Sequence, residues 1–389
     1  MKQMIALMFL GIALSLSAIS ISHQNADSPV EIQGDFTLSA LAHEALYTRI
    51  SVQDATPSGR PGEAELPIYS KLVALPATGN LSVTSNTYRY EEYSLDSPVL
   101  PVGSADAIPV SDSYYSRDEW LPQEIVSISQ PNIMRGYRFC QVAVNPVQYN
   151  PAQNKIRVLK DVDIQLKLDA SRGENPLLKS TPCSTEFAEF VTARILGAEG
   201  SRGTEKGNYL FISPPGATAT LAPLISWKQK LGYETTVVTT NETGTQNTDI
   251  LAWLQNAYDT WETPPQYVVL VGDVTGSFII PTFYKPATYP AGDMNETDHS
   301  YTLLEGSDYF PDVFIGRLSF QTLMQLQTII SKIIHYESQP DLSSDWMDEA
   351  LMLSLVQTYY YGYYSGRETV MAVREKLLDF EYTTVDTFI

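Results

Sequence analysis

Positive charge is scarce in this sequence of 389 residues, where 25 Lys and Arg face 45 Asp and Glu for a formal net charge of −20. The field of so acidic a chain repels phosphate, which argues against nucleic acid as a partner. Low charge density excludes a disordered chain, because charged residues make up only 18% and aromatic residues reach 11%. The length predicts a folded protein of two or three domains.

Familiar catalytic motifs are missing as well. The sequence has no G-x-S-x-G elbow, no H-E-x-x-H helix and no Walker loop. Asp298, His299 and Ser300 are triad residue types, but consecutive residues cannot face one another as a triad. Neither cysteine, Cys140 or Cys183, has a histidine nearby in sequence. A disulfide between them and two inert thiols both stay open.

Only one long hydrophobic run is present, at residues 4–16, after the positive charge of Lys2. Ala18-Ile19-Ser20 then offers small residues at the positions of a cleavage site, so residues 1–20 are predicted to be a secretory signal peptide. The alternative is a membrane anchor, but the run falls short of the ~20 residues that a spanning helix needs. We therefore expect no membrane span in the mature chain and a secreted or cell-surface location.

The chain changes character near residue 180. Residues 25–180 carry a period-2 pattern, as in Val162, Ile164 and Leu166, broken by turn signals, which predicts an all-β sandwich. Residues 208–389 alternate apolar strands with amphipathic helices, which predicts an α/β domain with a mainly parallel sheet. Its predicted strands include 267–271 and a central strand at 350–355.

A helix at 184–197 and a polar, glycine-rich linker are expected between the two domains, over residues 181–207. Arg202 and Lys206 make this linker a candidate processing site for a trypsin-like activity. The alternative is an ordinary flexible linker, which exposure alone would make cleavable.

Carboxylates gather in the second domain. Asp273 directly follows the strand 267–271, and ligands of such sheets bind beyond the carboxyl ends of strands. Asp308 and Asp312, with the main-chain carbonyl of Phe310 between them, have the alternate-residue spacing of a looped calcium site. Two solvated aspartates in an acidic surface loop explain the same spacing, so the pattern alone leaves both readings open.

Two sets of segments resemble one known family, the gingipain-type cysteine peptidases (peptidase family C25). The first set is similar to the family's propeptide and comprises residues 65–76, Arg135-Gly136-Tyr137-Arg138 and residues 145–151. The second set is similar to the start of its catalytic domain and comprises residues 227–233, 268–273, 312–318 and 335–337. The resemblance implies a caspase-like α/β domain, truncated at its C-terminus, behind a β-sandwich propeptide. That propeptide would contact the catalytic domain within the same molecule and keep it latent.

The resemblance also implies a calcium site. Its ligands would be the carboxylates of Asp273, Asp308 and Asp312 and the main-chain oxygens of Glu305 and Phe310. The family's nucleophile is a cysteine activated by a histidine, and both motifs would lie beyond Ile389, because Cys140 and Cys183 precede the catalytic domain.

These features predict a zymogen of a secreted cysteine endopeptidase, acting on proteins or peptides, from which the catalytic pair is missing. The fragment alone is expected to be inactive. The alternative is a non-enzymatic exported surface or adhesion protein with a degenerate peptidase-like domain. Carbohydrate binding by the sandwich is a third hypothesis, which rests on the 24 tyrosines.

Overall fold

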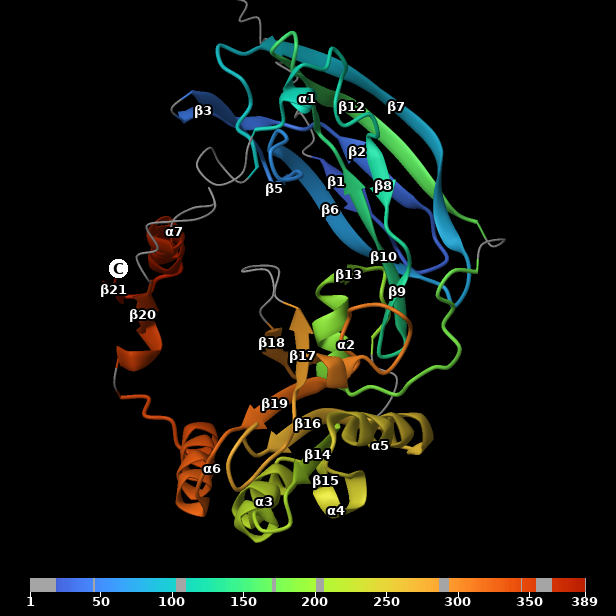
Figure 1. The fold of residues 1–389 in the computed structure, drawn as a ribbon. Helices are drawn as coiled ribbons and strands as arrows, with labels where there is room; N and C mark the ends of the chain where they lie inside the picture. Colours follow the sequence, from blue (N-terminus) through green and yellow to red (C-terminus); the bar gives the residue numbers. More distant parts are fainter. Residues whose placement is uncertain are drawn as a thin grey trace, which may run out of the picture.

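The computed structural model describes residues 19–44, 46–102, 110–169, 173–200, 206–286, 294–343, 345–354 and 366–388. Two sheet-rich halves follow one another along the chain, and Figure 1 shows one above the other. The predicted signal peptide lies outside the described residues up to residue 18, and the first strand, β1 (Ser20–Ser22), begins at its last residue.

The N-terminal half is built from two facing antiparallel sheets. The first contains β1, β2 (Val30–Gly34), β7 (Asn80–Ser94), β11 (Val147–Asn150) and β12 (Lys155–Asp169). The second contains β5 (Thr56–Ser58), β6 (Leu66–Leu75), β8 (Val126–Ile128), β9 (Asn132–Met134), β10 (Tyr137–Val144) and the parallel β13 (Ile195–Leu196). A hairpin of β3 (Leu38–Glu44) and β4 (Tyr47–Val52) and the short helix α1 (Asp112–Tyr115) complete it.

Alternation along the strands creates the core of this half. Ile164 and Leu166 of β12 are buried, whereas Asp163 and Lys167, which flank them, are exposed. The buried face packs against Val73 of β6 and the equally buried residues of β10. Each such side chain stabilises the fold by ~1.5–3 kcal/mol, so the two sheets hold together as a sandwich.

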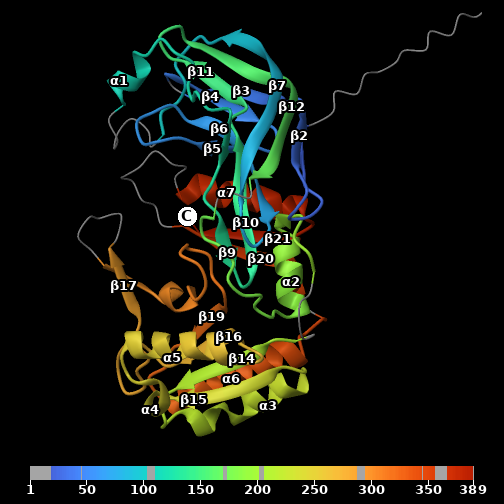
Figure 2. The same ribbon diagram turned by 90° about the vertical axis from the view of Figure 1, so that its right-hand side faces the viewer.

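The C-terminal half has three layers, with a parallel sheet between two layers of helices. Its strand order is β15 (Glu234–Thr239), β14 (Asn208–Ser213), β16 (Pro265–Val271) and β19 (Phe314–Leu318). One face packs on α5 (Asn247–Thr260), and the other on η1 (Thr218–Leu221), α3 (Ala222–Lys230) and α6 (Leu323–Ser338). Figure 2 shows the sheet between these helices. The short elements α4 (Thr240–Thr243), η2 (His299–Thr302) and the hairpin β17 (Phe283–Pro286) and β18 (Met294–Thr297) connect them.

The predicted central strand at 350–355 is not part of this sheet. After η3 (Asp345–Asp348), β20 (Glu349–Leu353) pairs in parallel with β21 (Thr384–Phe388), and α7 (Gly366–Asp379) accompanies the pair. Among the described strands, β19 pairs only with β16. Leu351 and Leu353 are 58% and 69% exposed, because no described element covers that face of the two-stranded pair. An apolar run alone does not fix which sheet a strand joins.

A short helix lies between the halves. The predicted helix 184–197 is shorter in the structure, where α2 (Thr185–Thr192) begins after the capping residue Ser184. Ile195 is buried in the sandwich as part of β13, which ends the helical path. The rings of Phe187 and Phe190 pack against Phe314 of β19, with centroid distances of 5.3 and 5.5 Å. This helix therefore bridges the sandwich and the α/β half.

Candidate functional site

The two halves meet at the turn between β9 and β10. This β9–β10 turn (Arg135 and Gly136) lies against the segment that leads into β19, which we call the acidic loop (residues 304–312). The contact lies at the amino edge of the parallel sheet, since the loop precedes β19 and Arg135 reaches the residues that open β16.

The turn is a tight hairpin with an unusual residue at its tip. Arg135 has φ +43° and Gly136 has φ +73°, as expected of a two-residue turn in which both central residues are left-handed. Glycine suits this backbone, and a Cβ at position 136 would stand 2.9 Å from the backbone nitrogen of Thr181. A long side chain at Arg135 is strained there, so its surroundings must hold it in place.

The Arg135 guanidinium is buried, with only 2% of the residue exposed. It donates to four main-chain oxygens, those of Pro182 at 2.9 Å, Pro265 at 2.7 Å, Pro264 at 3.0 Å and Asp312 at 3.2 Å. Burial lowers the pKa of Arg135, and nearby groups including Tyr258, Asp312 and Glu305 act against this shift. The Arg135 side chain therefore binds the segment after the sandwich and, in the α/β half, the start of β16 and the end of the acidic loop.

Three carboxylates of the acidic loop accept backbone N–H groups from the sandwich. Ile133 N donates to Asp308 Oδ2 at 2.7 Å, Arg135 N to Asp312 Oδ1 at 2.8 Å, and Gly136 N to Glu305 Oε2 at 3.1 Å. Charge-assisted hydrogen bonds of this kind are about twice as strong as neutral ones. Three backbone donors, one in β9 and two in the turn, thus bind one carboxylate each.

Side chains of the sandwich half add to this contact. Asn175 Nδ2 donates to Asp308 Oδ2 at 3.1 Å, and Thr181 Oγ1 donates to Glu305 Oε2 at 3.0 Å. The ring of Phe139 meets that of Phe310 edge-on, at 4.7 Å between centroids. Polar and apolar contacts therefore reinforce one another along the loop.

Asp312 is the most enclosed of the three acids, with no exposed surface. Its second oxygen accepts Leu304 N at 2.8 Å and Glu305 N at 2.7 Å, so the loop folds around it. Burial raises the pKa of Asp312 to about 7, against the effect of its backbone hydrogen bonds.

The structure does not bring the five predicted calcium ligands together. Strands β16 and β19 are parallel, with Tyr267 beside Phe314 and Val271 beside Leu318. Asp312 precedes the amino end of β19, whereas Asp273 follows the carboxyl end of β16, so roughly 15 Å or more of strand separates them. In the described part of the chain, no group of three or more His, Cys, Asp or Glu side chains is placed to hold a metal. The set including Asp273 is therefore wrong as one site.

Asp273 lies at the carboxyl edge, where ligands of such sheets bind. Its Oδ2 accepts the side-chain amide of Gln321 at 2.9 Å, and its Oδ1 accepts Val274 N at 2.7 Å. A pocket of about 420 Å³ borders Asp273, with Phe320 and Ile329 among its apolar lining residues.

Of the two predicted processing residues, Lys206 is held rather than free. Its ammonium pairs with Glu186 of α2 and lies over the ring of Tyr233, 5.1 Å from the centroid. The next two residues, Gly207 and Asn208, are buried, and Asn208 begins the central strand β14. Arg202 lies outside the described residues.

Both cysteines are buried and not bonded to each other. Cys140 and Cys183 are 1% and 2% exposed, and both are free thiols in the structure. Burial raises the pKa of Cys140 to about 12, which disfavours a reactive thiolate. Within residues 298–300, Asp298 pairs with Arg317 at 2.7 Å.

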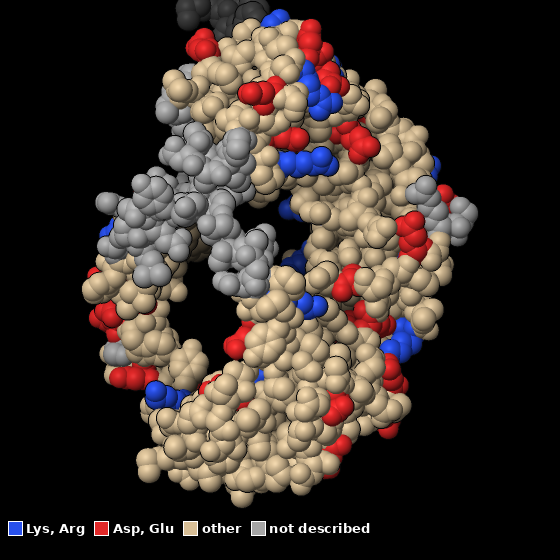
Figure 3. Space-filling model, viewed as in Figure 1, with Lys and Arg blue, Asp and Glu red and all other residues tan. Residues whose placement is uncertain are grey.

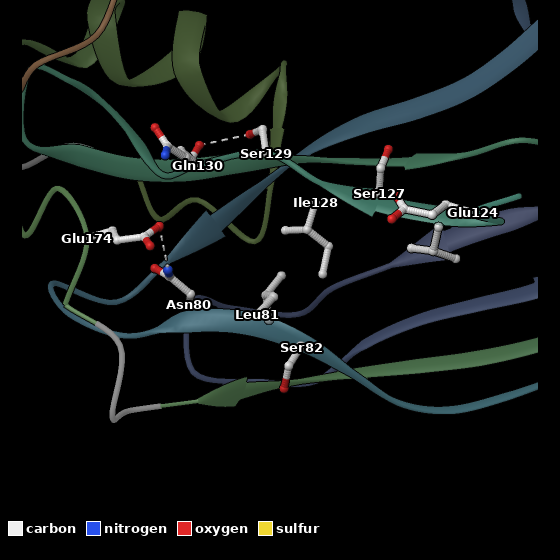
Figure 4. Close-up of a pocket in the computed structure, with 10 residues that line it drawn as sticks. Asn80, Leu81, Ser82, Glu124, Ser127, Ile128, Ser129, Gln130 and Glu174 are labelled. Atoms are coloured by element: carbon white, nitrogen blue, oxygen red, sulfur yellow. Dashed lines mark hydrogen bonds between the residues drawn. The ribbon is translucent and has the colours of Figure 1, made fainter. Parts of the chain in front are cut away.

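The sandwich has a pocket of its own, of about 340 Å³. Figure 4 shows Leu81 of β7 and Ile128 of β8 facing one another across it, with Glu174 and Glu124 toward its two ends. Asn80 Nδ2 donates to Glu174 Oε2 at 3.2 Å, so one of these acids is already bound within the sandwich. On the face shown in Figure 3, acidic side chains are scattered rather than gathered into one patch.

The structure defines a two-domain chain, in which the β9–β10 turn of a β-sandwich binds the acidic loop of an α/β domain. Comparison with known families agrees: residues 33–182 match the family described as Propeptide_C25, and residues 203–386 match Peptidase family C25. The chain belongs to this family, the gingipain-type C25 peptidases with their propeptide.

Similar curated proteins come from Porphyromonas gingivalis. The chain is 27% identical to Gingipain R2 over 308 residues, which cover 75% of this chain and 40% of that protein. It is 24% identical to Lys-gingipain over 337 residues, which cover 81% of this chain and 19% of that protein. The chain thus spans well under half the length of either relative.

Solved structures of the same family also match. A complex of the pro- and mature domains of RgpB from Porphyromonas gingivalis is 23% identical, covers 46% of this chain and 98% of that chain, and has a TM-score of 0.37. The Arg-specific cysteine proteinase gingipain R is 23% identical, covers 46% of this chain and 40% of that chain, and has a TM-score of 0.40. In the described residues no helix has the length and apolar character needed to cross a membrane.

Proposed function

We propose that this chain is the N-terminal portion of a secreted cysteine endopeptidase precursor, in which the sandwich holds the peptidase domain in a latent state. The observation that supports it most directly is the contact of the β9–β10 turn with the acidic loop. Five hydrogen bonds from Arg135 and Gly136 reach the α/β half, at Pro264 and Pro265, where β16 begins, and at Glu305 and Asp312 of the acidic loop. Family membership supplies the peptidase chemistry.

The nucleophile of the proposed enzyme is not one of the two cysteines of this chain. Both thiols are buried, and Cys140 lies inside the sandwich core. Among the described histidines, His299 donates from Nε2 to the carbonyl oxygen of Tyr309 at 3.0 Å, and it is remote in sequence from both thiols. We propose that the reactive cysteine and histidine belong to sequence beyond these 389 residues, as the greater length of the relatives allows.

Two measurements test this proposal. The 389-residue chain, expressed alone, should hydrolyse no peptide or casein substrate in the presence of thiol. The precursor that carries the rest of the peptidase domain should be latent, and Arg135→Ala should give it thiol-dependent activity before any cleavage of the linker. Turnover by the short chain that Cys140→Ala abolishes would contradict the proposal, and so would a longer precursor without a cysteine–histidine pair.

A further inference from the structure

The sandwich has an open side, where one strand of each sheet presents an edge that no described strand covers. In the first sheet this strand is β7, which pairs with β12 alone, and in the second it is β8, which pairs with β10 alone. The sandwich pocket of about 340 Å³ lies between them, and Figure 4 shows Leu81 of β7 and Ile128 of β8 on opposite walls. An open strand edge beside an apolar pocket is the arrangement that receives an extended peptide as an additional strand.

The ladder between β8 and β10 shows which backbone groups of β8 face the open side. Ser129 N donates to Gln141 O at 2.9 Å, so these two residues form a hydrogen-bonded pair. Such pairs alternate with non-hydrogen-bonded ones in an antiparallel ladder, so Ser127 is the next residue that bonds to β10. Val126 and Ile128 therefore turn their N–H and C=O groups away from β10. An added strand would find two donors and two acceptors there.

The rim of the pocket is acidic. Glu124 and Glu174 are exposed toward its two ends, and none of its ten lining residues is Lys or Arg. The Glu174 end is firmly built, because the buried Arg138 donates to Glu174 O at 2.7 Å and to Asn80 Oδ1 at 3.0 Å. At the other end, Glu124 accepts Asn145 Nδ2 at 2.8 Å through its main-chain oxygen, and its carboxylate is turned to solvent. Two exposed carboxylates favour a cationic occupant and disfavour an acidic one.

We propose that this groove between β7 and β8 binds an extended basic segment of another polypeptide, which adds to β8 as a strand. An apolar side chain of the segment enters between Leu81 and Ile128, and Lys or Arg two residues before and after it reach Glu124 and Glu174. Residues two apart in a strand share a face and lie about 7 Å apart, so a basic-x-apolar-x-basic pattern directs all three side chains to the pocket. The inference does not depend on the proposed peptidase function, because it uses only contacts within the sandwich.

Hydrogen–deuterium exchange of the whole chain tests the proposal, with the synthetic peptide Lys-Thr-Ile-Thr-Lys, blocked at both ends, as the probe. The peptide should slow exchange at the amides of Val126 and Ile128, because these N–H groups would then donate to it. Ser127 is an internal control, since its N–H faces β10 and should exchange at the same rate with and without peptide. Exchange at Val126 and Ile128 that stays unchanged at about 1 mM peptide, the limit of millimolar affinity, would overturn the proposal.

Two variants of the chain sharpen the result, with affinity measured by calorimetry and folding checked by the melting temperature. Val126→Pro removes one outward N–H without removing a ladder bond, a change that edge strands tolerate, and it should weaken peptide binding about tenfold. Glu124→Gln, which leaves the backbone unchanged, should weaken binding about two- to fivefold. Glu189→Gln, an exposed change on α2, is its matched control and should bind as the natural chain does.

Two further outcomes would count against this occupant. A peptide with glutamates in place of both lysines should bind much more weakly, and equal binding would contradict the role of the acidic rim. Protection of Val126 and Ile128 that grows with the concentration of the chain, without any peptide, would identify a second copy of the chain as the occupant instead.

Discussion

Arg135 and Asp312 form two hydrogen bonds, one from backbone to side chain and one from side chain to backbone. The amide N–H of Arg135 donates to the carboxylate of Asp312 at 2.8 Å, and the Arg135 guanidinium donates to the main-chain oxygen of Asp312 at 3.2 Å. Both residues are buried, with 2% and 0% of their surface exposed. This pair fixes the sandwich to the amino edge of the sheet through backbone and side chain together.

Replacing Arg135 should destabilise the chain strongly. Arg135→Ala leaves several buried carbonyls without donors, which costs about 3–5 kcal/mol. Arg135→Lys should recover little, since a single ammonium cannot match a planar guanidinium that binds four oxygens. Urea unfolding measures the loss, and Arg194→Ala, at an exposed site just after α2 where the side chain contacts Phe190, should cost no more than about 1 kcal/mol. Equal effects of the two alanine variants would contradict the assigned role of Arg135.

Gly136 offers a test of the turn's backbone. Gly136→Ala places a Cβ at φ +73°, within 2.9 Å of a backbone nitrogen that cannot move away easily. We expect a loss of about 1–3 kcal/mol in the free energy of unfolding. Gly173→Ala is the matched control, because a Cβ there would meet nothing within 4 Å. A melting temperature that falls equally in both variants would show that the turn is not constrained.

The sequence predicted the layered parts of the fold because burial there follows periodicity. The alternation of Ile164 and Leu166 and the apolar run of β16 each correspond to a strand in the expected half. The position of β20 was missed, since an apolar strand pattern carries no information on which sheet will accept it. The end of α2 was missed because Ile195 gains more by joining β6 than by extending a short helix.

The interface was harder to predict than the fold. Arg135-Gly136 between two apolar runs is a recognisable turn signal, but no local pattern tells that its N–H groups meet acids about 170 residues away. The spacing of Asp308 and Asp312 predicts a cation site, but in the structure both accept backbone N–H groups of the sandwich. Asp273 was grouped with them through the resemblance, although the parallel register places it at the other edge.

Low pH should weaken the ion pair between Glu186 of α2 and Lys206 of the linker. Burial opposes ionisation of Glu186, but hydrogen bonds from Lys206, Tyr267 and Tyr233 prevail and keep its pKa below the usual value. A lowered folded-state pKa contributes stability above the unfolded value, and this contribution is lost as the pH falls through the folded value. Glu186→Gln should therefore destabilise the chain near pH 7 and do so less near pH 3. Glu189→Gln, an exposed change on the same helix, should show no such trend.

Both thiols should be silent in the native chain. Cys140 and Cys183 are buried, and the raised pKa of Cys140 keeps that thiol protonated at neutral pH. A thiol reagent such as dithionitrobenzoate should label neither residue until denaturant is added, after which two thiols should react. Prompt labelling of one cysteine under native conditions would point to an exposed, reactive thiol and would reopen the question of the nucleophile.

Limited trypsin digestion should cut the linker ahead of Lys206 and not after it. Cleavage after Lys206 requires its side chain to leave Glu186, and requires Gly207 and Asn208 to leave the sheet, since proteases bind several extended residues. Arg202→Ala should remove the first cut, and Lys206→Ala should leave it in place. Mass spectrometry of the early products decides the point. A first product that begins at Gly207 would contradict the tethered position of Lys206.

Because the β9–β10 turn still binds the acidic loop after the cut, the two pieces should elute together in gel filtration, and Arg135→Ala should separate them.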